Sequence, residues 1–184
     1  MKKHNVKIAI ISFVKRDSAD VSLRLSKLLN LPHVSVEDDK AIYQAIYNKV
    51  NKTYSSNEVY TMILAEFHSR IEKEKKMKYF VSDGSVLNEI ALIKAGYKSH
   101  IKYGLIGRIL KPKYKDFEHR VEAVLQDYAA KAYDHVYLIK SIHKDNGSLL
   151  FESYIEKTLE SRNMKYSVIT DTSDATLLNA ISNL

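Results

Sequence analysis

The stretch that decides the fold is KIAIISFVKRDSADVSLRLSKLL, residues 7–29. It opens with a short apolar run rich in isoleucine, which predicts a buried strand because helices need longer periodic segments. A few polar residues follow, and apolar side chains then return at helical spacing, which predicts a helix over 19–29. A strand that leads within a few residues into a helix is the first half of a βαβ unit. We therefore expect a parallel sheet covered by helices.

The same alternation of strand and helix signals continues along the whole chain. Further apolar segments are short and bounded by polar residues, whereas the longer segments between them carry apolar side chains at helical spacing. This order predicts an α/β protein with three α/β/α layers around a mostly parallel five-stranded sheet, in a single domain spanning residues 1–184. We predict strands at 6–13, 33–36, 78–82, 134–139 and 166–170, and helices at 19–29, 39–52, 56–76, 87–95, 117–132, 149–162 and 174–183.

A few residues mark where these elements begin. Ser173 and Asp174 predict the N-cap of the last helix, because their side-chain oxygens can accept hydrogen bonds from the first backbone N–H groups. Pro112 predicts a break inside a lysine-rich loop that precedes the helix at 117–132, because proline disrupts a helix interior.

Composition excludes several classes of protein. The 184 residues are 45% apolar and 28% charged, as in ordinary globular domains. No apolar run approaches the roughly 18 residues that a membrane helix needs, so we expect no membrane partner. The chain has no cysteine, which excludes disulfides and thiolate metal sites and fits a cytoplasmic protein. Its seven histidines show no H-E-x-x-H spacing, so we expect no metal site.

The chain is basic, with 29 lysines and arginines against 22 aspartates and glutamates, and a net charge of +7. Such a charge favours nucleotides, nucleic acids or acidic proteins as partners. The 13 tyrosines could stack on bases. A solvated lysine-rich surface and tyrosines packed in the core would account for the same composition, so nucleic-acid binding stays one alternative among several.

Four features follow one another in the order of a known family. The strand and helix at 7–29 precede a second strand that ends in Glu37 and Asp38, a third strand followed by Asp83, and a polar loop at 141–148. This order resembles that of P-loop nucleoside and nucleotide kinases of the thymidylate-kinase and deoxynucleotide-kinase type, over nearly the whole chain. The resemblance implies the P-loop kinase architecture, a mobile lid at 141–148 and, for an active member, ATP with Mg²⁺.

The phosphate-binding loop of that family departs most from its pattern, G-x-x-x-x-G-K-[ST]. Aligning the apolar helix face places Ser12, Asp17, Ser18 and Ala19 on the four defined positions. Both glycines, the lysine and the hydroxyl that binds Mg²⁺ are therefore missing, and the first glycine of the chain is Gly84. Asp17 would place a negative charge where a phosphate should lie, so we predict that Asp17 or Ser18 is a plain N-cap.

Four residues remain as candidate nucleotide or phosphate ligands. Lys15 and Arg16 could replace part of the lost charge, Ser18 could offer a hydroxyl to Mg²⁺, and Lys144 lies in the lid-like loop. A mobile side chain does not replace a nest of oriented backbone N–H groups, so we do not expect this loop to hold ATP as the family does.

Asp83 is the candidate catalytic residue. It follows the strand at 78–82, where the related kinases carry an aspartate that is often followed by a phosphate-clamping arginine; here that position is Gly84. Asp83 could equally cap the helix that begins near Ser85. The resemblance also points to substrate-side positions, each of which is otherwise an ordinary charged residue of a surface or a helix start. These substrate-side candidates are Glu37, Asp38 and Arg108.

The leading hypothesis is a kinase-like P-loop domain that has lost its phosphate-binding motif and acts as a non-catalytic binding or regulatory protein for a protein, nucleotide or nucleic-acid partner. The first alternative is an active nucleoside or deoxynucleoside monophosphate kinase that uses ATP and Mg²⁺ in a rewired site. The second is a basic nucleic-acid-associated protein. Apolar helix faces at 56–71 and 87–103 would suit a homodimer, unless they belong to the core.

Overall fold

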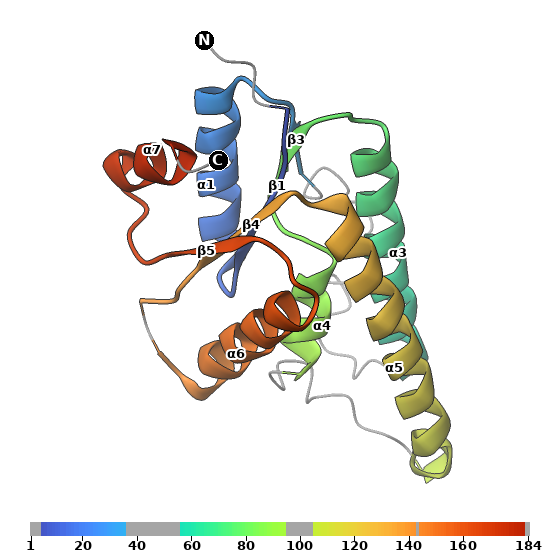
Figure 1. The fold of residues 1–184 in the computed structure, drawn as a ribbon. Coiled ribbons are helices and arrows are strands. Elements are labelled where there is room, and N and C mark those ends of the chain that lie inside the picture. Colours follow the sequence, from blue (N-terminus) through green and yellow to red (C-terminus); the bar gives the residue numbers. More distant parts are fainter. Residues whose placement is uncertain (1–4, 36–55, 95–104, 143, 183–184) are drawn as a thin grey trace.

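The computed structural model describes residues 5–35, 56–94, 105–142 and 144–182. Within them, a central sheet is covered by helices on both faces (Figure 1). The predicted helix at 39–52 lies outside the described residues.

The middle layer is a five-stranded sheet in which every strand pair is parallel. The strand order is β2-β3-β1-β4-β5, so the first strand of the chain lies at the centre. Strands β1 and β4 end together, because Ser12 lies opposite Ile139 in their register. The strands are β1 (Lys7–Ser12), β2 (His33–Val34), β3 (Phe80–Ser82), β4 (His135–Ile139) and β5 (Tyr166–Ile169).

Helices form the two outer layers. Helices α1 and α7 pack on one face of the sheet, and α3, α4, α5 and α6 pack on the other (Figure 1). None of the helices in the described segments is both long and apolar enough to cross a membrane. The helices are α1 (Lys15–Leu29), α3 (Ser56–Lys75), α4 (Leu87–Lys94), α5 (Leu105–Ala132), α6 (Asn146–Ser161) and α7 (Asp174–Ser182).

Strand β1 explains why the sheet needs helices on both faces. Successive side chains of a strand point to opposite sides, and β1 is apolar on both. Ile8 and Ile10 contribute to the core beneath α1 and α7, whereas Ala9 and Ile11 contribute to the opposite core, which contains Phe151 of α6. All five side chains are fully buried. Each buried isoleucine or phenylalanine stabilises the fold by about 1.5–3 kcal/mol relative to an exposed one.

The predicted fold class is confirmed, with a sheet that is entirely rather than mostly parallel. Each strand lies inside its predicted segment and is shorter by one or two residues at one or both ends. Helix α6 begins three residues earlier than predicted because Asp145 and Ser148 form a capping box. The Ser148 N–H donates to Asp145 Oδ1 at 2.6 Å, and the Asp145 N–H donates to Ser148 Oγ at 3.0 Å.

The predicted start of the helix at 117 is wrong. Helix α5 begins at Leu105 and runs through Pro112, where a loop was expected. A proline removes one hydrogen bond from a helix interior, but the bonds on either side of it remain. The long part of α5 that follows Pro112 packs its apolar residues against the sheet, which holds the helix in place.

Candidate functional site

Most of the predicted site residues that the structure describes lie where the strands end. Ligands of parallel α/β sheets bind at the edge formed by the carboxyl ends of the strands. Lys15, Arg16 and Ser18 follow β1 at this edge, Asp83 follows β3, and Lys144 follows β4.

The connection between β1 and α1 is only two residues long, Phe13 and Val14. The N–H of Val14 donates to Ser12 Oγ at 3.2 Å, and the N–H of Asp17 donates to the Val14 carbonyl at 3.0 Å. Val14 is the N-cap and offers no side-chain cap. The predicted N-cap at Asp17 or Ser18 is therefore wrong, because both residues lie inside the first turn of α1. The backbone N–H groups of Val14 and Asp17 are therefore bonded to Ser12 and Val14 within this connection and the turn that follows it.

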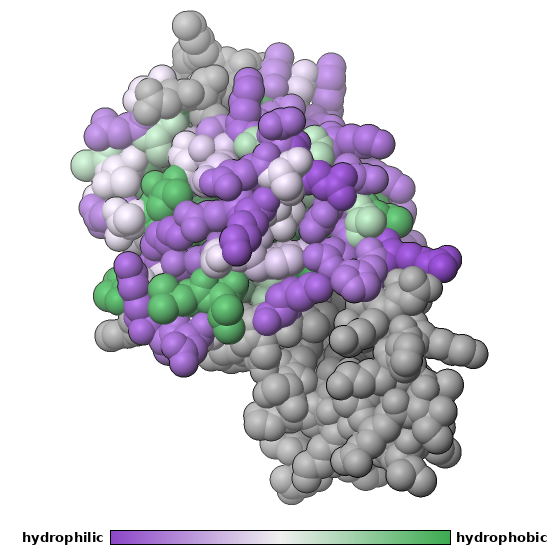
Figure 2. All heavy atoms as spheres, turned by 60° about the horizontal axis from the view of Figure 1, so that its bottom comes forward, coloured by the Kyte–Doolittle hydropathy of each residue, from purple (hydrophilic) through white to green (hydrophobic). Residues whose placement is uncertain are grey.

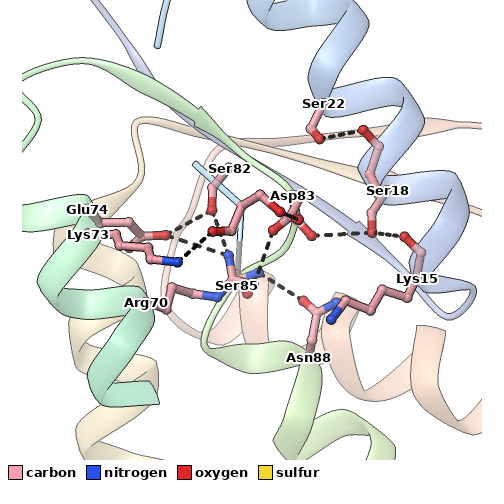
Figure 3. A network of polar contacts seen from close by, with 12 residues as sticks. Lys15, Ser18, Ser22, Arg70, Lys73, Glu74, Ser82, Asp83, Ser85 and Asn88 are labelled. Atoms are coloured by element: carbon pink, nitrogen blue, oxygen red, sulfur yellow. Dashed lines mark hydrogen bonds and ion pairs between the residues drawn. The ribbon is translucent and has the colours of Figure 1, made fainter. Parts of the chain in front are cut away.

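Ser18 joins α1 to the end of β3. Its side chain is fully buried, and Oγ lies 2.9 Å from the carbonyl of Lys15 and 3.3 Å from the carbonyl of Asp83 (Figure 3). Lys15 and Arg16 are exposed on the same turn. The hydroxyl of Ser18 is thus used within the protein.

Asp83 is buried, with 2% of its surface exposed, and both of its carboxylate oxygens have partners. Ser35 Oγ, just after β2, donates to Asp83 Oδ2 at 2.6 Å, and Arg70 Nη2 of α3 lies 3.5 Å from Oδ1. The Arg70 Nη1 donates to Ser82 Oγ at 2.7 Å. Figure 3 shows Arg70 reaching from α3 toward the loop that follows β3.

Glu74 completes this buried polar cluster, which we define as Ser35, Arg70, Glu74, Ser82, Asp83, Tyr128 and Tyr133. Its carboxylate accepts hydrogen bonds from Ser82 Oγ at 3.0 Å, Tyr128 OH at 3.0 Å and Tyr133 OH at 2.9 Å. Arg70 Nη1 lies 3.9 Å from Oε1.

Burial is the largest influence on the pKa values of Glu74 and Tyr133 in this cluster. It raises the pKa of Glu74, while the charge of Arg70 and the hydroxyl donors oppose the rise. Burial and the neighbouring Glu74 raise the pKa of Tyr133 well above its usual range, so its hydroxyl stays protonated and donates. The guanidinium of Arg70 lies within 3.9 Å of the carboxylate of Glu74 and within 3.5 Å of that of Asp83.

Gly84 has the conformation and the space that this arrangement requires. Its φ is +154°, and a Cβ atom built on it would lie 3.0 Å from Arg70 Nη2. The arginine that the resemblance leads one to expect at this position is absent, but the guanidinium of Arg70 lies beside it in space. The alternative of Asp83 as a helix cap is wrong. Ser85 Oγ accepts the N–H of Leu87 at 3.0 Å instead, and Asn88 Oδ1 accepts the N–H of Ser85 at 3.0 Å.

The remaining predicted site residues are not drawn together. Lys144 is exposed in the connection between β4 and α6, and residues 146–148 form the first turn of α6. A mobile lid at 141–148 stays a prediction. Arg108 falls within α5, but its side chain lies outside the described residues, as do Glu37 and Asp38. In the described part of the chain, no three acidic or histidine side chains gather to hold a metal ion.

The sequence analysis missed Arg70, Glu74 and the two tyrosines of the buried polar cluster. One signal was present in α3, where Arg70 and Glu74 lie three and seven residues after the buried Phe67, on its core-facing side. Charged residues on the apolar side of a helix need buried partners. That pattern indicates a buried polar cluster, although not which residues complete it.

No protein-family model matches the sequence, and no curated protein is significantly similar to it. Solved structures of one enzyme, the deoxyadenosine kinase from M. mycoides, do match over almost the full length of both chains. The complex with dATP has 16% identity, a TM-score of 0.64 and coverage of 96% of this chain and 97% of that one. The complex with dCMP and a flexible dCDP has 14% identity, a TM-score of 0.61 and coverage of 97% and 100%. The complex with dCTP has 18% identity, a TM-score of 0.59 and coverage of 96% and 97%. The chain therefore has the fold of the P-loop nucleoside kinases.

Proposed function

We propose that this chain is a non-catalytic binding or regulatory protein built on the nucleoside-kinase fold. The observation that carries the proposal is the β1–α1 connection, which has two residues and is closed by its own hydrogen bonds. Phosphate-binding loops at this position are longer and glycine-rich, and they point several backbone N–H groups at the phosphates. Here Asp17 adds a negative charge in the first turn of α1, which would repel a phosphate.

The surroundings of Asp83 support the same proposal. A residue that contacts a metal shell or takes a proton from a substrate needs a carboxylate oxygen that faces the ligand. Both oxygens of Asp83 lie against protein donors, Ser35 on one side and Arg70 on the other. The Asp83 side chain is also 0% exposed, which favours a role in stabilising the fold at this edge over contact with a substrate.

The proposal is tested by nucleotide binding and turnover. Isothermal titration with ATP and Mg²⁺ is expected to give no micromolar binding. Incubation with deoxyadenosine, deoxycytidine and their monophosphates is expected to give no phosphorylated product. The M. mycoides deoxyadenosine kinase, assayed in parallel, supplies the positive control. Micromolar affinity for ATP together with turnover of any of these acceptors would refute the proposal.

An active nucleoside or deoxynucleoside monophosphate kinase is the alternative, since solved structures similar in fold hold dATP, dCTP, and dCMP with dCDP. Its rewired site would use Lys15, Arg16, Asp83 and Lys144 with ATP and Mg²⁺. In that case Asp83→Asn would abolish product formation, and unchanged product formation would argue against this site. The net charge of +7 also keeps nucleic acid as a partner class. The absence of DNA and RNA binding at about 50 mM salt would exclude it.

A further inference from the structure

Several large apolar side chains are exposed to solvent at the edge of the sheet where β1 and β4 end. Ile142 is 88% exposed, Leu150 55%, Leu149 46% and Val14 43%. We call these four residues the edge patch. Figure 2, which looks toward this end of the molecule, shows apolar side chains collected into a band among polar ones. Single exposed apolar residues are ordinary, but a group of them usually marks a binding surface.

The topology explains why the four residues share one edge. Strands β1 and β4 are neighbours and end in register, so the segments that leave them, 13–14 and 140–142, start side by side. The ring of Phe13 packs on Phe151 of α6 with 5.6 Å between centroids, which holds the β1–α1 connection against the start of that helix. Leu149 and Leu150 lie on the exposed side of the same helix turn.

Basic side chains border the edge patch. Lys15 and Arg16 follow Val14, and Lys144 lies two residues after Ile142; all three are exposed. Lys140 lies at the same edge and forms ion pairs with Glu152 and Glu156 at 3.3 and 2.8 Å. Among the described residues of 13–17 and 140–150, Asp17 and Asp145 supply negative charge; Asp17 is half-buried in the first turn of α1, and the Asp145 carboxylate caps α6. Three exposed basic side chains against these two carboxylates leave the border with an excess of positive charge.

We propose that the edge patch docks a protein segment whose apolar side chains are flanked by aspartates or glutamates. This rests on the proposed non-catalytic function and gives the chemistry of the partner. Apolar side chains of the segment would cover the four residues of the patch, and its carboxylates would meet the positive border. The edge of the sheet that binds nucleotides in proteins of this fold would here bind a partner protein.

Two other occupants fit less well. A second copy of this chain would bring two positive borders together, and the whole chain already carries a charge of +7. An anionic membrane surface attracts a helix whose exposed face is uniformly basic. The exposed face of α6 continues with both Lys157 and Glu160, so it lacks that character.

The test uses two synthetic amphipathic helical peptides that share one leucine stripe, the first flanked by glutamates and the second by lysines. Fluorescence anisotropy measures their affinity for the full chain, and circular dichroism checks the fold of each variant. The glutamate peptide is expected to bind and the lysine peptide to bind at least about tenfold more weakly. The double variant Ile142→Asp with Leu150→Asp should lower the affinity for the glutamate peptide by about tenfold or more. The matched control is Leu178→Asp, which changes an equally exposed leucine of α7 on the opposite face of the sheet and should leave the affinity unchanged.

Several results would overturn the proposal. These are no binding of the glutamate peptide, equal binding of both peptides, or no effect of the double variant. Binding to vesicles of phosphatidylserine and phosphatidylcholine that the double variant abolishes would assign the patch to a membrane instead. Self-association in sedimentation that the double variant abolishes would assign it to a second copy. Turnover of ATP in the assays above would refute the proposed function, and it is measured separately from peptide binding.

Discussion

Replacing Arg70 by methionine tests whether the buried polar cluster holds the carboxyl edge together. Methionine keeps much of the volume of the side chain and removes its charge and donors. Asp83 and Glu74 would then be buried carboxylates without a counter-charge, since their side chains are 0% and 1% exposed. Breaking a buried ion pair by removing one partner typically costs about 3–5 kcal/mol. We expect a loss near the lower end of this range, because Ser35 still donates to Asp83 and three hydroxyls still donate to Glu74.

The pH dependence of the loss distinguishes lost charge from lost packing. Burial already raises the pKa of Glu74, and removing the positive charge of Arg70 raises it further. A folded state with a raised carboxyl pKa binds a proton more tightly than the unfolded chain, so the charged carboxylate destabilises the fold at pH values above that pKa. As the pH falls through the raised pKa, Glu74 takes up a proton and the destabilisation shrinks. Urea unfolding followed by circular dichroism should show the largest loss at pH 7 and a smaller one at about pH 5.

Two companion variants make this experiment decisive. Arg16→Met removes an exposed arginine and should change the unfolding free energy by no more than about 0.5 kcal/mol. Adding Glu74→Gln to Arg70→Met removes one of the two uncompensated charges and should recover part of the loss. A loss below about 1 kcal/mol for Arg70→Met, or a loss that does not change between pH 7 and pH 5, would refute the role assigned to Arg70.

Further variants test other features of the structure by urea unfolding. Gly84→Ala should destabilise the fold by about 1–3 kcal/mol, since its positive φ and the 3.0 Å approach of a guanidinium both oppose a Cβ atom; Gly147→Ala, in the first turn of α6, should be neutral or stabilising, and equal effects would contradict this account. Asp145→Ala removes the capping box of α6 and should cost about 0.5–2 kcal/mol, whereas Asp145→Asn should cost less, and no difference from wild type would contradict the cap. Tyr133→Phe removes a donor to Glu74 and should cost about 1–3 kcal/mol at pH 7. That loss should decrease toward acid, where Glu74 is protonated, and a loss that grows toward acid would count against the hydrogen bond.

The sheet could be predicted from the sequence because its strands are short, apolar on both faces and separated by long periodic segments. The helix boundaries depended on contacts that are harder to see in advance. Helix α6 starts early because one aspartate and one serine cap each other, and α5 continues through Pro112 because its later turns are packed against the sheet. The early start of α6 reflects capping. The continuation of α5 through Pro112 reflects tertiary packing that outweighs the low helix propensity of proline.

The candidate site was only partly within reach of the sequence. The position of Asp83 at the end of β3 follows from its place after a predicted strand. Its surroundings do not follow, because Arg70 and Ser35 come from other elements and meet it only when the layers assemble. The tyrosines that donate to Glu74 lie 54 and 59 residues away in the chain. Tertiary packing brings the members of this polar cluster together, so their spacing in the sequence does not predict it.

The closeness of Gly84 and Arg70 has a consequence for which substitutions the chain tolerates. A larger residue at position 84 would have to adopt a positive φ and would need the Arg70 guanidinium to shift, because its Cβ atom would lie 3.0 Å from Nη2. Losing Arg70 first would leave two carboxylates buried without a counter-charge. The two positions are therefore expected to change together in related sequences, with arginine at one and a small residue at the other. Changing either residue alone is expected to destabilise the fold, so the two are expected to be retained as a pair.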